Sequence, residues 1–202
     1  MHGYLKSAFP LLGCCLLLLS PPVSAQETGG SEGNSSGYSG GNSSGGGTTT
    51  GRSPATRIST VPQVVTRLGQ MQALCVGSGA YVVDCLAERI EAIEADASNM
   101  AGYNEMHQIL QQAAKELRIL ARNNRDPLQP RAKLSSKDGQ LSSRPLVAVA
   151  PSRRRAAQTQ AVKILQEAET KLLRSSTQSV ERANQYRQVA QALGSNKVLL
   201  RS

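Results

Sequence analysis

After residue 58, apolar side chains recur at steps of three and four residues, which is the period of an amphipathic helix. From about Thr60 to Ala73 they form one face, and Pro62 falls in the first turn, where a missing N–H costs little. Ser59 or Thr60 can cap this segment. The face consists of Val61, Val64, Val65, Leu68, Met71 and Leu74. The pattern predicts a first helix that ends before Gly77.

A second apolar seam runs almost in heptads from Val83 to Ala121. We expect one long helix from about Gly79 to Asn123, because the seam keeps its register throughout. The alternative is a break near Ser98–Gly102, where Gly102 weakens a continuous helix. The seam comprises Val83, Leu86, Ile90, Ile93, Ala97, Met100, Asn104, His107, Leu110, Ala114, Leu117 and Ala121.

A third seam predicts a long C-terminal helix over residues 156–194, followed by a short tail at 195–202. Its face is small and only moderately apolar, so this helix needs a partner. The obvious partner is the second helix, packed antiparallel. The sequence therefore predicts an all-α fold, an elongated helical hairpin or coiled-coil-like bundle of three helices, with residues 59–122 as its hairpin.

Residues 123–155 separate the second and third helices and contain four prolines and the run Arg153–Arg155. Prolines at this density disfavour regular structure, which indicates an irregular connection. Within it, the apolar run 146–150 is a candidate strand or docking segment.

Residues 1–25 have the pattern of a secretory signal: Lys6, then an apolar stretch from Leu11 to Leu19, then small residues ending at Ala25. We expect cleavage after Ala25 and a secreted or periplasmic protein. A lipoprotein-like sequence ending at Cys14 is one alternative, and an uncleaved membrane anchor is another.

Residues 26–58 are rich in Gly, Ser and Thr, with ten Gly and six Ser among residues 26–51. Such a stretch has little to bury, so we expect a disordered tether ahead of the helices. Asn34 and Asn42 each begin an N-glycosylation acceptor triplet, which matters only in a eukaryotic source.

Cys75 and Cys85 are the two cysteines outside the predicted signal. An even pair in an exported chain most simply forms a disulfide, which here would join the end of the first helix to the start of the second. A metal site would need further Cys or His, and a redox site would favour the C-x-x-C spacing. No cofactor or metal is expected.

The chain carries a net charge of +9, and the excess lies in its C-terminal half, with +5 over residues 126–155 and +4 over residues 156–202. This asymmetry indicates contact with an anionic surface such as lipid or cell-wall polymer. Nucleic acid fits poorly, because aromatic side chains for base stacking are few. The candidate anion-binding residues are Arg153, Arg154, Arg155, Lys163, Lys171 and Arg174.

Two polar residues, Asn104 and His107, fall on the second seam. We expect them to form a buried polar layer that sets helix register; a pH-sensitive contact at His107 is the alternative. The acids of the same helix are expected on a solvated outer face. They are Glu88, Glu91, Glu94, Asp96 and Glu105.

The sequence contains no recognisable catalytic triad, metal motif or nucleotide-binding loop. The leading hypothesis is an exported, non-enzymatic helical interaction module or small scaffold that binds a protein partner, or itself, through its apolar seams. The alternative is a basic protein that binds an anionic polymer or membrane surface through its C-terminal half.

Overall fold

The computed structural model describes residues 57–175 and 179–201. The predicted signal, the predicted tether as far as residue 56 and the two glycosylation triplets lie outside the described residues. The described chain is all-α, as predicted. Its α-helices are α1 (Val61–Cys75), α2 (Val82–Ala97), α3 (Asn104–Asn123), α4 (Pro151–Arg174) and α5 (Val180–Ser195), with the short 3-10 helices η1 (Gly79–Tyr81) and η2 (Asn196–Leu200).

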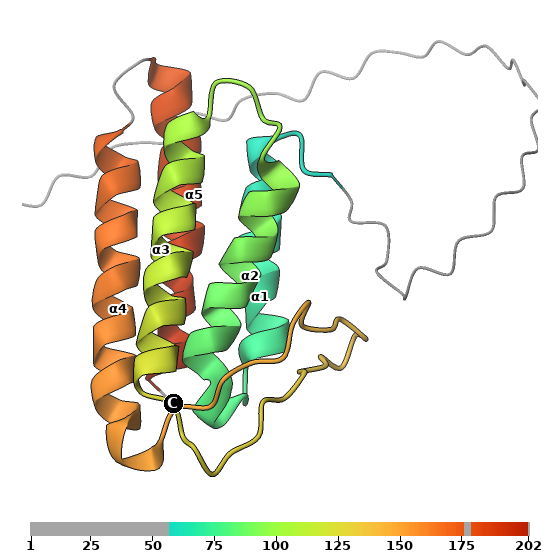
Figure 1. The fold of residues 1–202 in the computed structure, drawn as a ribbon. Helices are drawn as coiled ribbons and strands as arrows, with labels where there is room; N and C mark the ends of the chain where they lie inside the picture. Colours follow the sequence, from blue (N-terminus) through green and yellow to red (C-terminus); the bar gives the residue numbers. More distant parts are fainter. Residues whose placement is uncertain (1–56, 176–178, 202) are drawn as a thin grey trace, which may run out of the picture. The chain divides into compact units, whose positions relative to one another are not determined.

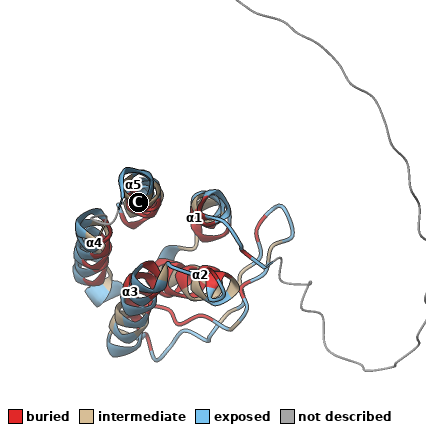
Figure 2. Ribbon diagram, turned by 90° about the horizontal axis from the view of Figure 1, so that it is seen from above, coloured by how far each residue is buried: buried red, intermediate tan, exposed pale blue. Residues whose placement is uncertain are grey.

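The helices form a bundle in which each α-helix lies beside its neighbours in sequence and runs opposite to the one before it (Figure 1). Seen along the bundle, α5 also lies beside α1 and closes the ring (Figure 2). The side-chain amide of Asn196 fixes this closure, because its Nδ2 donates to the carbonyl of Leu68 at 3.0 Å. The buried faces of the helices point into the ring and form one apolar core.

The first helix begins where the sequence predicts, with Thr60 at its N-cap and Pro62 in its first turn. The side-chain oxygen of Gln63 accepts hydrogen bonds from the N–H groups of Ser59 and Thr60, at 2.8 and 3.3 Å. The folded bundle nevertheless starts earlier than the predicted tether boundary at residue 58. Ile58 is only 2% exposed and belongs to the core.

The prediction of one helix from Gly79 to Asn123 is wrong, and the alternative break is confirmed. Helix α2 ends at Ala97 and α3 begins at Asn104. Gly102 lies between them with φ +82°, a left-handed conformation that glycine adopts far more readily than other residues. The chain thus reverses, and α2 and α3 pack side by side.

The predicted third helix is likewise two antiparallel helices, α4 and α5. Ser179 caps α5, its side-chain oxygen accepting the backbone N–H of Arg182 at 3.2 Å. Helix α4 also begins five residues earlier than predicted, at Pro151, because proline is favoured in the first turn of a helix. Arg153–Arg155 therefore lie on a helix and not in a loop.

Residues 124–150 connect α3 to α4 and are ordered as an open hairpin (Figure 1). Three isolated antiparallel bridges hold its two arms together. Its apolar run docks: Leu146 and Val149 are buried in the core, and the Val149 N–H donates to the carbonyl of Ala80 at 2.8 Å. Of the two alternatives for residues 146–150, docking is therefore confirmed.

The apolar seams are the inner faces of this bundle. Even the longest helix, α4, has 24 residues. At 1.5 Å per residue it is about 36 Å long. The predicted rod of two very long helices is therefore replaced by a shorter, wider bundle that covers its own seams.

Candidate functional site: a basic groove beside helix α4

The three consecutive arginines at the start of α4 point in different directions. Arg153 donates from Nη1 to the backbone carbonyl of Asn123 at 3.1 Å, which ties the start of α4 to the end of α3. Arg154 and Arg155 instead line an open groove between α4 and the C-terminal η2. Thus the cluster that the sequence predicts as one anion-binding element divides into one structural arginine and two groove arginines.

The groove has a volume of about 800 Å³ and follows the first four turns of α4. Arg154, Arg155, Lys163 and Arg201 are the four cations that line it. The remaining lining residues are neutral: Pro151, Gln158, Thr159, Val162, Gln166 and Leu200. Within residues 57–175 and 179–201, no acidic side chain lines the groove, so these residues give it a positive electrostatic potential.

The groove cations have no partner within the described part of the chain. The side chains of Arg155, Lys163 and Arg201 make no ion pair or hydrogen bond to any described residue. Arg154 is half-buried, and its Nε is buried without a hydrogen-bond partner among the described residues. A buried donor without an acceptor is unfavourable, so an acceptor from a bound molecule or from water would be favourable at this position.

The N-terminal end of α4 adds to the excess of positive charge in the groove. The N-terminal end of a helix carries partial positive charge and normally favours acidic side chains. In α4 the first turn has no acidic residue, and Ala150 at the N-cap supplies no side-chain acceptor. Three arginines follow instead. Such a departure from local preference is expected at functional sites.

The remaining predicted anion-binding residues lie elsewhere. Lys171 pairs with Glu167 at 2.8 Å, and this hydrogen bond raises the pKa of the Lys171 amine. Arg174 is exposed in the last turn of α4, far along the helix from the groove. In contrast, Arg201 lines the groove but was missed. Nothing in the local sequence distinguishes it, since η2 brings it to α4 only through the closure of the bundle.

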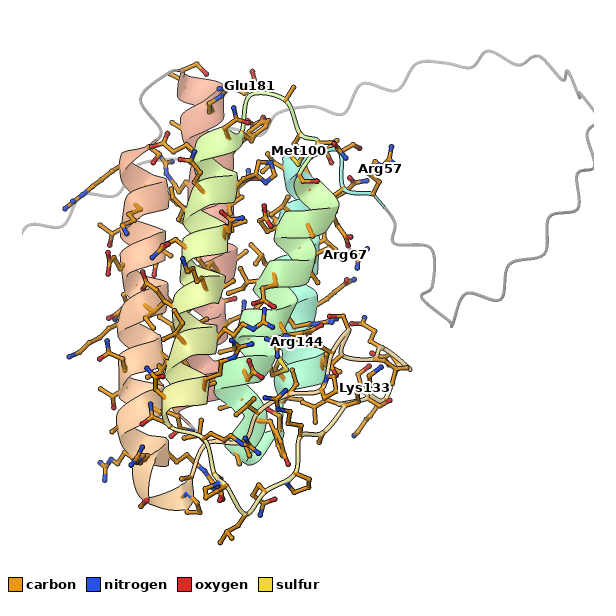
Figure 3. All side chains as sticks on the ribbon, viewed as in Figure 1. Arg57, Arg67, Met100, Lys133, Arg144 and Glu181 are labelled. Atoms are coloured by element: carbon orange, nitrogen blue, oxygen red, sulfur yellow. A yellow bond between two sulfur atoms is a disulfide. The ribbon has the colours of Figure 1, made fainter. Side chains whose placement is uncertain are left out.

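A second charged cluster, on α2, is buried. Asp84 and Glu88 are both 0% exposed. Asp84 accepts two hydrogen bonds from the Arg144 guanidinium, at 2.8 and 2.9 Å, and one from the Val147 N–H at 2.7 Å. Figure 3 labels Arg144 where the 124–150 segment lies against α2. This cluster fastens that segment to the bundle.

Glu88 also holds the 124–150 segment against α2. Its carboxylate pairs with Arg89 and accepts the N–H of Ser143 at 2.7 Å. Burial alone would raise the pKa of Glu88, but the hydrogen bonds from Arg89 and Ser143 outweigh it and leave the pKa below its ordinary value. The predicted solvated acidic face is therefore wrong at Glu88, because the 124–150 segment, far away in sequence, covers it and donates the Ser143 N–H.

The predicted polar layer of Asn104 and His107 does not form. Asn104 is the first residue of α3 and is exposed. His107 is buried, and neither ring nitrogen has a hydrogen-bond partner among the described residues. The two residues separate because the break at Gly102 makes Asn104 a helix end instead of a mid-helix position.

The predicted disulfide is present between Cys75 and Cys85, whose Cα atoms are 5.8 Å apart. It joins the end of α1 to the first turn of α2, next to Asp84. The part of the chain that the structure describes holds no group of three or more His, Cys, Asp or Glu residues suited to a metal ion. Among the helices of residues 57–175 and 179–201, none is long and apolar enough to span a membrane.

The fold and the groove define a small disulfide-linked helical bundle with a basic surface site. No protein-family profile, curated protein or solved structure gives a significant match to this chain.

Proposed function

We propose that this protein is an exported, non-enzymatic binding module that holds an anionic partner in the groove beside α4. One observation carries the proposal. Among the described residues, four cations without partners line a groove that has no acidic side chain, and Arg154 and Arg155 stand near the positive end of α4. A bound anion would supply the acceptors that the groove lacks and relieve the repulsion among its cations.

The other hypothesis, a scaffold that associates through its apolar seams, has less support. The seam residues of all five α-helices are buried against one another inside the chain's own bundle. A partner could reach them only if the bundle opened. The exposed large apolar residues of the described chain lie on different elements, for example Ile119 on α3 and Val180 on α5.

Export remains a prediction from residues 1–25. In a periplasmic or extracellular location, the anionic molecules that the protein would meet include acidic polymers and the headgroups of acidic lipids. Both are chemically suited to arginine, whose planar guanidinium donates two parallel hydrogen bonds to a phosphate, sulfate or carboxylate.

The proposal is tested by binding to heparin, a sulfated polysaccharide, over a range of salt concentrations. We expect affinity to fall steeply with salt, since each cation that contacts the polymer releases a counterion. The double substitution R154A/R155A should reduce the slope of log K against log salt by about 1.4, or two contacts. The matched control is R174A, which removes an arginine from the same helix outside the groove.

The heparin binding of R154A/R155A and R174A decides whether the groove is the binding site. If R154A/R155A binds like the parent protein, or if R174A weakens binding as much, the groove is not the site. Thermal unfolding of each variant shows whether it folds. All three arginine side chains are at least partly exposed, so we expect folded proteins.

A further inference from the structure

The placement of the groove cations indicates the form of the ligand. Arg154 and Arg155 lie near the start of α4, whereas Lys163 lies eight residues beyond Arg155 on the same helix. At 1.5 Å per residue the two positions are about 12 Å apart along the helix axis. A single phosphate or sulfate group would contact both only if the two long side chains turned toward each other along the helix, whereas successive anionic groups on one chain can contact each cation where it lies.

The surface between the two charged ends is neutral. Thr159 and Val162 lie there, and the Thr159 hydroxyl already donates to the carbonyl of Arg155 at 3.0 Å. This stretch therefore offers a narrow, uncharged floor on which the neutral part of a chain can rest. Anionic groups on either side of that part would reach Arg154 and Arg155 at one end and Lys163 at the other.

We infer, on the basis of the proposed function, that the groove binds a linear polyanion, a chain whose successive anionic groups engage both ends of the groove. An acidic polysaccharide has this chemistry. Its charged groups repeat along the chain and are separated by neutral, hydroxyl-bearing units.

An acidic bilayer is the competing anionic partner, and the groove suits it less well. The site is an open groove whose lining comes mainly from α4, with Leu200 and Arg201 contributed from the C-terminal end. Its α4 cations follow the length of that helix, an arrangement that suits a chain of anionic groups. Of the apolar residues that line it, Leu200 is 4% exposed and Val162 is half-buried, and only Pro151 is exposed. A membrane-docking surface instead exposes apolar side chains for insertion.

The experiment measures binding of the full chain to sulfated heparin oligosaccharides of increasing length, from the disaccharide upward. We expect affinity to rise with length until the oligosaccharide spans the groove and to level off beyond that point. R154A/R155A should weaken binding at every length. K163A should weaken only the longer oligosaccharides and reduce their salt slope by about 0.7, one contact. K115A is the control, because Lys115 is an exposed lysine on α3 outside the groove.

The possible results separate the two proposals. If the disaccharide binds as tightly as longer chains and K163A has no effect, the linear-polyanion inference is overturned, while the anion site of the proposed function stands. If vesicles of equal parts phosphatidylglycerol and phosphatidylcholine bind but oligosaccharides do not, the inference is also overturned. If none of these probes binds, or R154A/R155A changes nothing, the proposed function itself fails.

Discussion

The buried acids of α2 and the cations beside α4 have opposite surroundings: the acids are buried and paired, whereas the cations face an open groove. On α2, Asp84 and Glu88 are buried, and both carboxylates have a cationic partner from the same chain. Beside α4, Arg155, Lys163 and Arg201 face an open groove with no partner among the described residues. Charge alone therefore does not identify a site. Matched and buried charges hold the fold together, whereas unmatched charges facing solvent are available to a ligand.

This contrast predicts large effects on stability at α2 and large effects on binding at α4. Removing a buried ionic partner leaves the other charge without compensation, which is strongly destabilising. Removing an unmatched surface cation leaves nothing uncompensated. The following predictions run from the largest expected effect to the smallest.

We expect D84A to lower the free energy of unfolding by about 3 kcal/mol, because Arg144 and the Val147 N–H lose a shared buried acceptor. The loss is at the low end for a buried pair, since Arg144 keeps its ion pair with Glu91 at 3.3 Å. Denaturant unfolding measures this effect. Faster hydrogen exchange at the Val147 N–H would locate it at the 124–150 segment. E94A is the control on the same helix, outside the cluster. The double variant D84L/R144M should be more stable than D84A, since it removes both charges; equal stability would contradict the assigned pairing.

We expect C75A/C85A to lower the free energy of unfolding by about 3 kcal/mol, because the disulfide closes a short loop at the junction of α1 and α2. Thermal unfolding with and without a thiol reductant measures it. The parent protein should lose stability in reductant and the variant should not. A parent protein that is insensitive to reductant while fully reduced would show that the bond adds nothing to stability.

Glu88 should make stability depend on acidic pH. Its pKa is lowered from 4.5 in the folded protein, so the unfolded chain binds its proton more readily. The stabilisation is therefore complete above about pH 4.5 and is lost as the pH falls through the lower, folded-state pKa. Melting temperatures measured across this range should fall less steeply for E88Q than for the parent protein. E94Q should keep the parent slope; if E88Q keeps it too, another carboxylate is responsible.

Removing an arginine should change the free energy of unfolding only slightly, and with opposite signs at the two ends of α4. R155A removes an exposed cation from the positive end of the helix and should raise the free energy of unfolding by about 0.3 kcal/mol. R174A removes a cation from the last turn and should lower it by a similar amount. Denaturant unfolding at low ionic strength provides the comparison. Loss of stability in both variants would show that Arg155 has a structural partner.

Much of the fold follows from the sequence, because helical periodicity and covalent pairing are local properties. The seams identify nearly all the helical residues, Pro62 marks the start of α1, and the two cysteines outside the predicted signal pair as predicted. The positions at which the helices break are harder to predict from the sequence. The heptad-like pattern continues through Gly102 even though the chain reverses there, because both α2 and α3 must present an apolar face to the same core.

The candidate site was predictable only in part. Arg154, Arg155 and Lys163 were named as anion-binding candidates from charge and spacing, but so were Lys171 and Arg174, which lie outside the groove. Arg201 was not named. Its position depends on η2 folding back beside α4, a contact between separate helices that no local pattern records.

The sequence by itself determined the helical class, the disulfide and the excess of positive charge in the C-terminal half, because these depend on residue type and short-range spacing. Only the tertiary structure decided which charges are matched. Arg144 reaches Asp84 across sixty residues and is neutralised. Arg154, another arginine of the basic C-terminal half, lies where the described chain brings up another arginine and no acid. The physical reason is that electrostatic pairing depends on distance in space, and the closure of the helical bundle sets that distance.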